Sequence, residues 1–296
     1  GDSLLQTVDQ ITSPIDNPYL FGKLASLHAL SDIFAMNASP NSVQVLLNLP
    51  FASTDIQTQE MTLIMQGVLE VLSAHNCILS GGHTAEAKEL SLGLVVNALP
   101  RINKPLFQND HLKAGDLLVL TKPIGTGVIL AAQMQNTEHS HWCYRGDWHN
   151  AAVDSMLISN KHAADIFSEI DVEACTDITG FGLIGHLCEM LEASQCKAEI
   201  NLDKIPLLKG AKELSHQNVR SSLYPQNFEI VKSLSISNKV KEHPSFPLLF
   251  DPQTSGGLLA GLNGQAFNQL KQRTDIEYYV IGKVTADKSA WDLNIL

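Results

Sequence analysis

Carboxylate side chains occur at three places in the chain where the surrounding residues are suited to binding phosphate or metal ions. Asp9 ends the apparent strand QTVD, Asp32 lies in HALSDIFAM, and Asp177 lies in CTDITGFGLIGHLCEML. Asp177 and its neighbouring threonines could instead cap the helix predicted to begin near Gly180 to Gly182, because Asp and Thr accept hydrogen bonds from first-turn N–H groups. A strand-ending Asp9 is also ordinary turn chemistry.

Asp32 has the most unusual position of the three. The spacing of Leu24, Leu27 and Leu30 predicts a helix over about 18–36, so Asp32 falls in its last turn, where the helix dipole disfavours a carboxylate. A charge among apolar residues needs a partner or a metal ion. The alternative is an exposed Asp that pairs with a nearby Lys.

Three glycine-containing segments are further candidates for ligand contact. In SGGHTAE, 80–86, paired glycines let backbone amides approach a phosphate, and His83 and Thr84 add polar side chains. TKPIGTG, 121–127, and DPQTSGG, 251–257, also lie between predicted elements. SGGHTAE is equally explained as a turn between strands, and a turn is the preferred interpretation of DPQTSGG. The chain contains no GxxxxGK[ST] sequence, which excludes a P-loop.

The cysteines and histidines give weaker signals. The chain has five cysteines, no CxxC pair and no visible activating context for a thiol, which favours a reducing compartment, the cytoplasm by default. HSHWC, 139–143, matches no common zinc spacing and is interpreted as a surface loop. The cysteines are Cys77, Cys143, Cys175, Cys188 and Cys196.

Bulk composition limits the possible partners. The 296 residues are 44% hydrophobic and 17% charged, which suits a globular protein with room for two domains. The net charge of −11 opposes nonspecific binding to nucleic acid or to an anionic membrane. No apolar run approaches the roughly 18 residues of a membrane span. The chain begins within an apparent strand, LLQTVD, without a signal-peptide pattern, so we expect a fragment or a processed product.

Periodicity and turn residues predict two domains, 1–105 and 106–296. The first is expected to be α/β, and the second α+β, beginning at DLLVL. The elements predicted for the first are a strand ending at Asp9, a helix over 18–36, a strand over 42–50, a helix over 57–76, and strands over 77–80 and 90–99. Those predicted for the second are helices near 151–168 and 181–193, a strand at 198–202, irregular sequence to about 245, and a closing strand, helix and strand.

Seven segments together resemble one enzyme family. TVD, PIDNPYLFGKLA, LSDIFAM, SGGHT, TKPIGTGV, TDITGFGLIGHLCEM and LFDPQTSGGLL occur in the order found in selenophosphate synthetase, also called selenide, water dikinase. The resemblance runs from residue 7 to about 260. The wider superfamily includes aminoimidazole ribonucleotide synthetase, thiamine-monophosphate kinase and a hydrogenase maturation protein, all of which use ATP. TDITGFGLIGH together with DPQTSGG points to the selenium branch.

The resemblance implies a two-domain α/β (α+β) fold like that of aminoimidazole ribonucleotide synthetase. Its N-terminal domain would form a β-barrel with a second copy in a homodimer, and its C-terminal α+β domain would cover the nucleotide. The implied reaction is the conversion of ATP, selenide and water into selenophosphate, AMP and orthophosphate. The implied site residues are Asp32 and Asp177 as Mg²⁺ ligands, Thr7 and Asp9 at ATP or its metals, and Gly82, His83 and Thr84 at the nucleotide.

Several features depart from the family pattern. Its members carry a glycine-rich segment with a Cys or selenocysteine and a Lys, then an Asp-Asp pair, upstream of the point where this chain begins. We therefore expect no catalytic residue in this chain and an inactive or impaired protein when it stands alone. His28 and Asn37 replace the more familiar Asn and Gly, and Val8 replaces a common Thr.

The sequence leaves open a fusion partner and two alternative functions. LFGKLASLHALSD and VRSSLYPQN look like the version fused behind a flavin-dependent pyridine nucleotide oxidoreductase. A need for K⁺ and the source of selenide are not determined by the sequence. The alternative functions are another ATP-dependent kinase or ligase of the superfamily, which would release ADP, and a non-catalytic nucleotide-binding dimerisation module.

Overall fold

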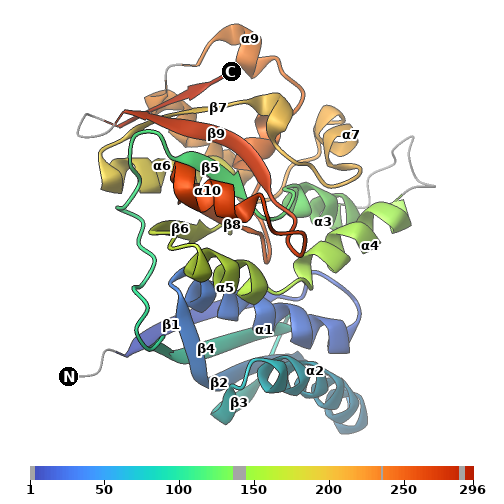
Figure 1. The fold of residues 1–296 in the computed structure, drawn as a ribbon. Coiled ribbons are helices and arrows are strands. Elements are labelled where there is room, and N and C mark those ends of the chain that lie inside the picture. The colour runs from blue at the N-terminus through green and yellow to red at the C-terminus, as the bar shows by residue number, and fades with distance from the viewer. Residues whose placement is uncertain (1–3, 136–144, 235, 287–290) are drawn as a thin grey trace. The chain divides into compact units, whose positions relative to one another are not determined.

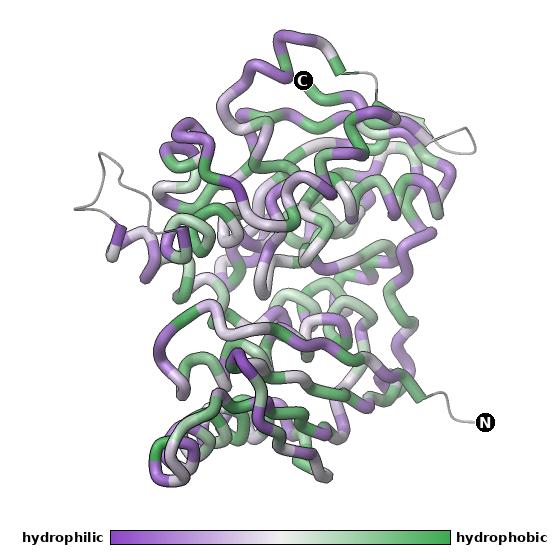
Figure 2. The backbone as a smooth tube through the Cα atoms, turned by 180° about the vertical axis from the view of Figure 1, so that it is seen from behind, coloured by the Kyte–Doolittle hydropathy of each residue, from purple (hydrophilic) through white to green (hydrophobic). Residues whose placement is uncertain are grey.

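The structure is a computed structural model that describes residues 4–135, 145–234, 236–286 and 291–296. The chain divides into two compact units (Figure 1). Unit 1 takes in the residues up to Leu106 together with Leu157–Ser159, and unit 2 takes in Phe107–Met156 and Asn160–Leu296. Hydrophilic and hydrophobic residues alternate at short intervals along the backbone (Figure 2). Across the described ranges, none of the helices combines the length and the apolar character that a membrane crossing requires.

Unit 1 contains one sheet and two helices. Its strands are arranged in the order β1-β4-β2-β3, with β2 and β3 parallel and the other neighbouring pairs antiparallel. The helices pack on each other and on one face of the sheet. The elements are β1 (Leu5–Thr12), α1 (Pro18–Ala35), β2 (Ala38–Pro50), α2 (Thr54–Ala74), β3 (Ile78–Ala87) and β4 (Ser91–Pro100).

Helix α1 begins and ends where the sequence predicted. Asn17 caps it by accepting a hydrogen bond from Leu20 N at 3.0 Å, and Pro18 occupies the first position, where a missing N–H costs nothing. After its last turn, Asn37 has the left-handed φ of 57° that releases the chain from the helix. These local signals confirm the helix predicted over 18–36.

Residues 80–86 are not the loop predicted from the sequence but part of strand β3. This strand pairs in parallel with β2, with Gly82 opposite Val45 and Thr84 opposite Leu47. A Cβ at Gly82 would lie 2.3 Å from the Val45 carbonyl oxygen, so glycine is required there. Glycine disfavours strands locally, and hydrogen bonding to β2 overrides that preference. The strand predicted over 77–80 was therefore too short.

Unit 2 is built around a six-stranded sheet with the order β10-β7-β9-β5-β8-β6, in which β10 and β7 are parallel and the other neighbours antiparallel. Its first elements are β5 (Leu117–Leu120), α3 (Thr126–Met134), α4 (Arg145–Met156), α5 (Lys161–Glu169), β6 (Ala174–Asp177), α6 (Gly182–Ser194) and β7 (Lys197–Ile200). Short helices follow, η2 (Leu202–Lys204), α7 (Ala211–His216), α8 (Tyr224–Phe228), η3 (Glu229–Ser233), α9 (Asn238–Lys241) and η4 (Phe246–Phe250). The chain closes with β8 (Leu258–Leu262), α10 (Gly264–Leu270), β9 (Tyr279–Ala286) and β10 (Asp292–Ile295).

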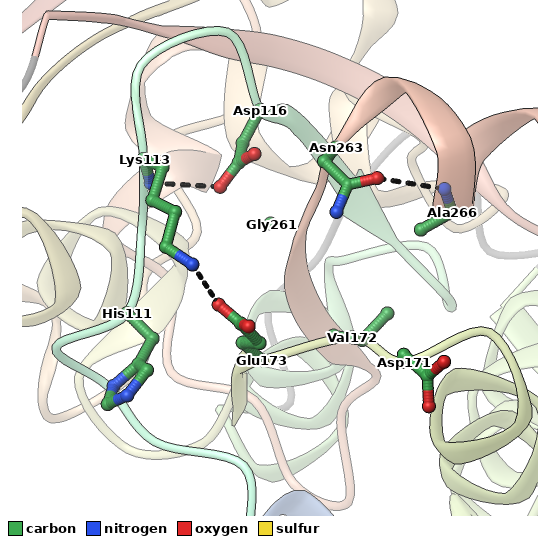
Figure 3. Close-up of a pocket in the computed structure, with 9 residues that line it drawn as sticks. All are labelled: His111, Lys113, Asp116, Asp171, Val172, Glu173, Gly261, Asn263 and Ala266. Atoms are coloured by element: carbon green, nitrogen blue, oxygen red, sulfur yellow. Dashed lines mark hydrogen bonds and ion pairs between the residues drawn. The ribbon is translucent and has the colours of Figure 1, made fainter.

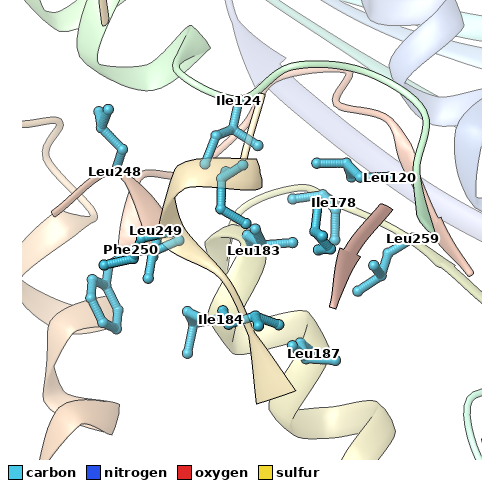
Figure 4. Packing of buried hydrophobic residues seen from close by; sticks show 14 of the residues in the cluster. Leu120, Ile124, Ile178, Leu183, Ile184, Leu187, Leu248, Leu249, Phe250 and Leu259 are labelled. Carbon is cyan, nitrogen blue, oxygen red and sulfur yellow. The ribbon is translucent and has the colours of Figure 1, made fainter. Parts of the chain in front are cut away.

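Helix α6 supplies much of the core of unit 2. Leu183, Ile184 and Leu187 are fully buried and lie near Leu249 and Phe250 of η4 (Figure 4). Their spacing puts them on one face of the helix, as the sequence predicted. The helix begins at Gly182, within the predicted interval.

The stretch near 151–168 forms two helices rather than the one predicted. The break between α4 and α5 coincides with Leu157–Ser159, which belong to unit 1 while both helices belong to unit 2. Ser159 Oγ lies 2.8 Å from His75 Nε2, a contact within unit 1. Hydrophobic periodicity indicates which residues are buried, but it does not indicate which unit each residue belongs to. The break between the two helices was therefore not predicted.

Candidate functional site

Two pairs of polar side chains meet between β1 and α1 in unit 1. Thr7 and Asp9 lie on the same, more buried face of β1, and His28 and Asp32 are one turn apart on α1. Thr7 Oγ1 donates a hydrogen bond to Asp32 Oδ2 at 2.5 Å, and His28 Nε2 lies 3.3 Å from Asp9 Oδ2. Three residues selected from the sequence, Thr7, Asp9 and Asp32, therefore lie in one cluster.

Partners within the cluster stabilise the carboxylates of Asp32 and Asp9. Asp32 lies in the last turn of α1, as predicted, and the Thr7 hydroxyl offsets part of the cost of a carboxylate there. His28 is buried and offers a ring nitrogen to Asp9, a contact that the sequence did not predict. Because β1 and α1 are separated by a turn in the chain, only their packing reveals these two pairs.

The cluster has the chemistry of a site for a hard cation that keeps other ligands. The Asp9 side chain is 31% exposed and Asp32 is partly exposed, so carboxylate oxygens remain accessible. Among the described residues, no group of three or more His, Cys, Asp or Glu side chains is arranged to enclose a metal ion. Mg²⁺ commonly takes one or two carboxylates and completes its shell with water and phosphate oxygens, which these residues fit.

A groove of about 390 Å³ runs beside strand β3. Gly81, Gly82, His83 and Thr84 of β3 line one side of it. The remaining lining residues are apolar and come from β2, α2 and the start of β3, namely Val45, Leu47, Met61, Met65 and Leu79. Methionine side chains adapt to flat rings, and the volume is within the range of small-molecule sites. The residues predicted to contact a nucleotide thus line a ligand-sized groove.

Three glycine-containing segments of unit 2 converge at one end of its sheet. Residues 121–127 follow β5, residues 178–181 join β6 to α6, and residues 251–257 precede β8, the strand between β5 and β6. Ile178 N donates to Gly257 O at 2.9 Å, and Thr121 N donates to Leu258 O at 3.0 Å. The sequence presented these segments as separate turns, and strand pairing joins them.

Two polar side chains of the 251–257 segment cap helix α3 from a distant part of the chain. Asp251 Oδ2 accepts a hydrogen bond from Val128 N at 3.0 Å. Gln253 Oε1 accepts from the backbone N–H groups of Gly125 and Thr126 at 2.8 and 3.1 Å. Burial raises the pKa of Asp251 to about 7, and the hydrogen bond from Val128 N acts in the opposite direction. The polar character of DPQTSGG is therefore explained by capping as well as by turning.

Asp177 is the last residue of β6 and does not cap the following helix. The N-cap position of α6 is occupied by Phe181, and no side chain caps it there. Asp177 is 6% exposed, and its register partner in β8 is Leu258. Asp177 therefore does not occupy the capping position of α6 that the local pattern allowed.

Lys122 is a buried lysine near Asp177 that the sequence did not single out. Its side chain is 4% exposed, and Nζ donates a hydrogen bond to Ser255 O at 3.0 Å. Burial lowers the pKa of Lys122 to about 7, while the negative charge of Asp177 acts in the opposite direction. Lysine is seldom buried without a partner, so Lys122 belongs to the electrostatic environment of Asp177.

A small cavity of unit 2 lies at the opposite end of strands β5, β8 and β6 (Figure 3). Lys113 Nζ bonds the Glu173 carboxylate, and Lys113 N donates to Asp116 Oδ2 at 2.9 Å. Asn263 Oδ1 accepts from Ala266 N at 2.9 Å and caps α10. The cavity measures about 20 Å³, which is room for about one water molecule. It has the properties of a structural polar cluster.

The cysteines of the described ranges are unsuited to nucleophilic chemistry. Cys77, Cys175, Cys188 and Cys196 are free thiols and are buried. Burial raises the pKa of Cys77 to about 11 and that of Cys188 to about 12. Cys143 and the HSHWC segment lie outside the described residues.

Comparison with known proteins first defines the class. Residues 1–99 match the family "AIR synthase related protein, N-terminal domain", and residues 113–291 match "AIR synthase related protein, C-terminal domain". Thiamine-monophosphate kinase from Stenotrophomonas maltophilia K279a has a similar structure, with a TM-score of 0.71 and 17% identity over 99% of this chain and 85% of that one. Hydrogenase maturation protein HypE in complex with ATP gives a TM-score of 0.69 and 15% identity over 97% of this chain and 78% of that one. The chain therefore has the two-domain AIR synthase fold that the sequence predicted.

A sequence relative then defines the branch. Selenide, water dikinase from Caldanaerobacter subterraneus subsp. tengcongensis is 34% identical over 297 aligned residues, covering 99% of this chain and 83% of the relative. The chain belongs to the selenide, water dikinase family, whose members are phosphotransferases. This confirms the family resemblance stated from the seven sequence segments.

Proposed function

We propose that this chain is the ATP- and Mg²⁺-binding body of an enzyme that converts ATP, selenide and water into selenophosphate, AMP and orthophosphate. The observation that carries the proposal is the 34% identity to selenide, water dikinase across 99% of the chain. ATP as the nucleotide is supported by HypE, a protein of the same fold in complex with ATP.

The proposed roles in unit 1 follow from its polar cluster and groove. Asp32 binds Mg²⁺, with the Thr7 hydroxyl holding the carboxylate by the hydrogen bond to Oδ2. Asp9, held by His28, contacts ATP or its metal ions. The nucleotide contacts on β3 are Gly82, His83 and Thr84, which line the groove. In unit 2, Asp177 is the proposed Mg²⁺ ligand, and it occupies a strand end whose neighbouring loops are hydrogen-bonded to one another.

Metal ions explain how an acidic protein can bind a polyphosphate. The chain has a net charge of −11 and no Walker lysine. Bound Mg²⁺ would neutralise phosphate charge, and exposed glycine backbone would supply hydrogen-bond donors. The protein itself holds Asp32 and Asp9 in fixed orientations through Thr7 and His28. It has no net positive charge that would attract the phosphates.

We also propose a homodimer formed through the uncovered face of the unit 1 sheet. The outward positions of β1, β2 and β4 carry no Asp, Glu, Lys or Arg. Val8, Leu46 and Leu99 on this face are 66%, 41% and 44% exposed. An uncharged sheet face with exposed aliphatic side chains favours burial against a second copy, which would close the sheets into a barrel.

Several polar side chains of this face are paired with one another within the sheet. Gln6 Nε2 donates to Asn97 Oδ1 at 2.6 Å, and Asn97 Nδ2 donates to Ser42 Oγ at 3.2 Å. Gln10 and Asn48 both donate to Ser91 Oγ, at 3.0 and 2.9 Å. Because these amides are satisfied, covering the face would leave few unpaired polar groups.

Selenium chemistry requires a group that the described residues do not offer. The four described cysteines are buried, so we propose that the Cys or selenocysteine and the Lys come from a glycine-rich segment preceding Gly1. The chain alone is then expected to bind nucleotide without completing the reaction. A fused or partner oxidoreductase is a further proposal that rests on the resemblance of LFGKLASLHALSD and VRSSLYPQN.

Product analysis tests the proposed reaction. The chain together with the sequence that precedes it in the gene is incubated with ATP, Mg²⁺ and selenide, and phosphorus NMR follows the products. We expect AMP, orthophosphate and selenophosphate, all dependent on selenide. Release of ADP without selenide would contradict the proposal and favour another kinase of the superfamily. Isothermal titration of the chain alone with Mg²⁺ and a non-hydrolysable ATP analogue tests nucleotide binding separately.

A further inference from the structure

The segment that carries Asp177 into helix α6 needs external support to hold one conformation. This segment, 177–182, is called the Asp177 loop below. Gly180 has open space around a Cβ position, and Gly182 has a φ of 71°. Glycine loses more backbone entropy than other residues when a loop is ordered. Pairing with β8 holds the backbone of Asp177, so the path of the chain from Thr179 to Phe181 depends on contacts made by other parts of unit 2.

One support comes from helix α6 itself, through His186. The Thr179 N–H donates to His186 Nε2 at 3.1 Å, and Thr179 Oγ1 lies 3.2 Å from the same nitrogen. His186 is 8% exposed, and its ring lies 5.5 Å from the Phe181 ring. Because Nε2 accepts an N–H, the ring proton is on Nδ1, which faces Glu189 Oε2 at 3.5 Å.

A second support comes from helix α8, in the segment VRSSLYPQN. Asn227 Nδ2 donates to Gly180 O at 2.8 Å and to Phe250 O at 3.1 Å. One amide group thus joins the Asp177 loop to the end of η4, immediately before the 251–257 segment. Gln253 N adds a bond to Thr179 O at 2.9 Å. Three backbone groups of the loop, Thr179 N, Thr179 O and Gly180 O, are therefore held by groups from outside it.

We propose that His186 and Asn227 are positioning residues that fix the Asp177 loop and so set the orientation of the Asp177 carboxylate toward a divalent cation. The identity of the cation rests on the proposed function, whereas the bracing of the loop does not. Neither residue is assigned a contact with nucleotide or metal. The hydrogen bonds to His186 and Asn227 hold Thr179 and Gly180, the two residues that precede the N-cap residue Phe181.

Hydrogen exchange and Mg²⁺ titration of the whole chain test the proposal. In His186→Ala we expect the Thr179 amide to exchange about tenfold faster, since it loses a buried acceptor. The Mg²⁺ concentration needed for half-maximal binding of an ATP analogue should rise by about the same factor. His186→Gln, whose Oε1 can occupy the position of Nε2, should restore most of both. The matched control is His162→Ala, an exposed histidine of unit 2.

Asn227→Asp gives an independent arm with nearly unchanged shape. Replacing the Nδ2 donor by a carboxylate oxygen sets it against the Gly180 and Phe250 carbonyls, so the loop amides should again exchange faster than in the wild type. Unchanged exchange at 178–182 in both His186→Ala and Asn227→Asp would overturn the proposal. Equal Mg²⁺ dependence in all folded variants would overturn the role toward Asp177.

Two further outcomes are a His186→Ala variant that does not fold and a wild-type chain that binds no nucleotide. If His186→Ala does not fold, His186→Gln is compared with His186→Asn, because the Asn side chain is too short to reach Thr179 N. Faster exchange of the Thr179 amide in His186→Asn than in His186→Gln supports the proposal. Equal exchange of this amide in the two variants contradicts it. If the wild-type chain binds no nucleotide with Mg²⁺, the proposed function fails. Exchange at Thr179 then still decides whether His186 holds the loop.

Discussion

At the scale of single residues, unit 2 contains two buried ionisable groups whose pKa values both move to about 7 from opposite sides. Asp251 is raised from 3.8 and Lys122 is lowered from 10.5, in each case chiefly by burial. Each keeps a structural task, Asp251 at the start of α3 and Lys122 at the Ser255 carbonyl. Near neutral pH, small changes in their surroundings change their protonation.

These two groups predict opposite pH dependences of stability. Between about pH 4 and 7 the folded state holds a proton on Asp251 that the unfolded state has lost, so stability falls as pH rises. Between about pH 7 and 10.5 the unfolded state holds a proton on Lys122 that the folded state has lost, so stability rises, by at most about 1.4 kcal/mol per pH unit. Lys122→Met should flatten the alkaline limb and Asp251→Asn the acid limb. Urea unfolding across pH, without metal or nucleotide, measures both; parallel curves for wild type and Lys122→Met would contradict the assignment.

The carboxylates of the proposed site make a second prediction at this scale. Asp32→Asn and Asp177→Asn keep the side-chain shape but remove the charge that favours Mg²⁺. We expect Mg²⁺-dependent binding of an ATP analogue to weaken by about tenfold or more in each, with an unchanged unfolding midpoint. Asp55→Asn in unit 1 and Asp154→Asn in unit 2 are exposed controls. Wild-type affinity in either site variant would remove that residue from the site.

At the scale of elements, two glycines allow helices α1 and α2 of unit 1 to approach each other closely. Gly22 and Gly67 occupy reciprocal positions, where an added Cβ would lie 2.1 Å from the Ile64 and Tyr19 carbonyl oxygens. The same helix α1 carries His28 and Asp32 toward β1. Displacing α1 would therefore disturb the polar cluster as well as the core.

Gly22→Ala and Gly67→Ala should each destabilise the protein by about 1–3 kcal/mol, because the helices must separate to admit a methyl group. Chemical denaturation measures this change. Gly146→Ala is the matched control, since its Cβ would meet nothing within 4 Å and helix α4 gains from alanine, by about 0.5–1 kcal/mol. If all three variants had equal stability, close packing of α1 against α2 would not be what requires glycine at positions 22 and 67.

At the scale of the whole molecule, unit 1 presents an uncovered sheet face that a single copy leaves exposed to solvent. Leu46→Glu and Val8→Glu place charge on this face, so we expect a monomer by light scattering where the wild type forms a dimer. Far-UV circular dichroism should remain unchanged. Leu69→Glu on α2, 48% exposed, is the control and should stay dimeric. A wild-type monomer at micromolar concentration would contradict the proposed dimer.

Local signals determined a large part of the fold from the sequence alone. Asn17, Pro18 and Asn37 define the ends of α1, and the spacing of Leu183 and Leu187 defines the buried face of α6. Caps and helical periodicity depend on residues within about four positions, so a sequence displays them directly. The position of Asp32 in the last turn of α1 follows for the same reason.

Tertiary structure alone decided the contacts between distant segments. Gly82 lies in a strand because β2 pairs with it, Asp32 bonds Thr7 because α1 packs on β1, and Gln253 caps α3 across 127 residues of chain. Asp177 was a capping candidate by local chemistry, and the structure leaves it at a strand end near Lys122 instead. Such pairings depend on strand order and packing, which no local pattern encodes.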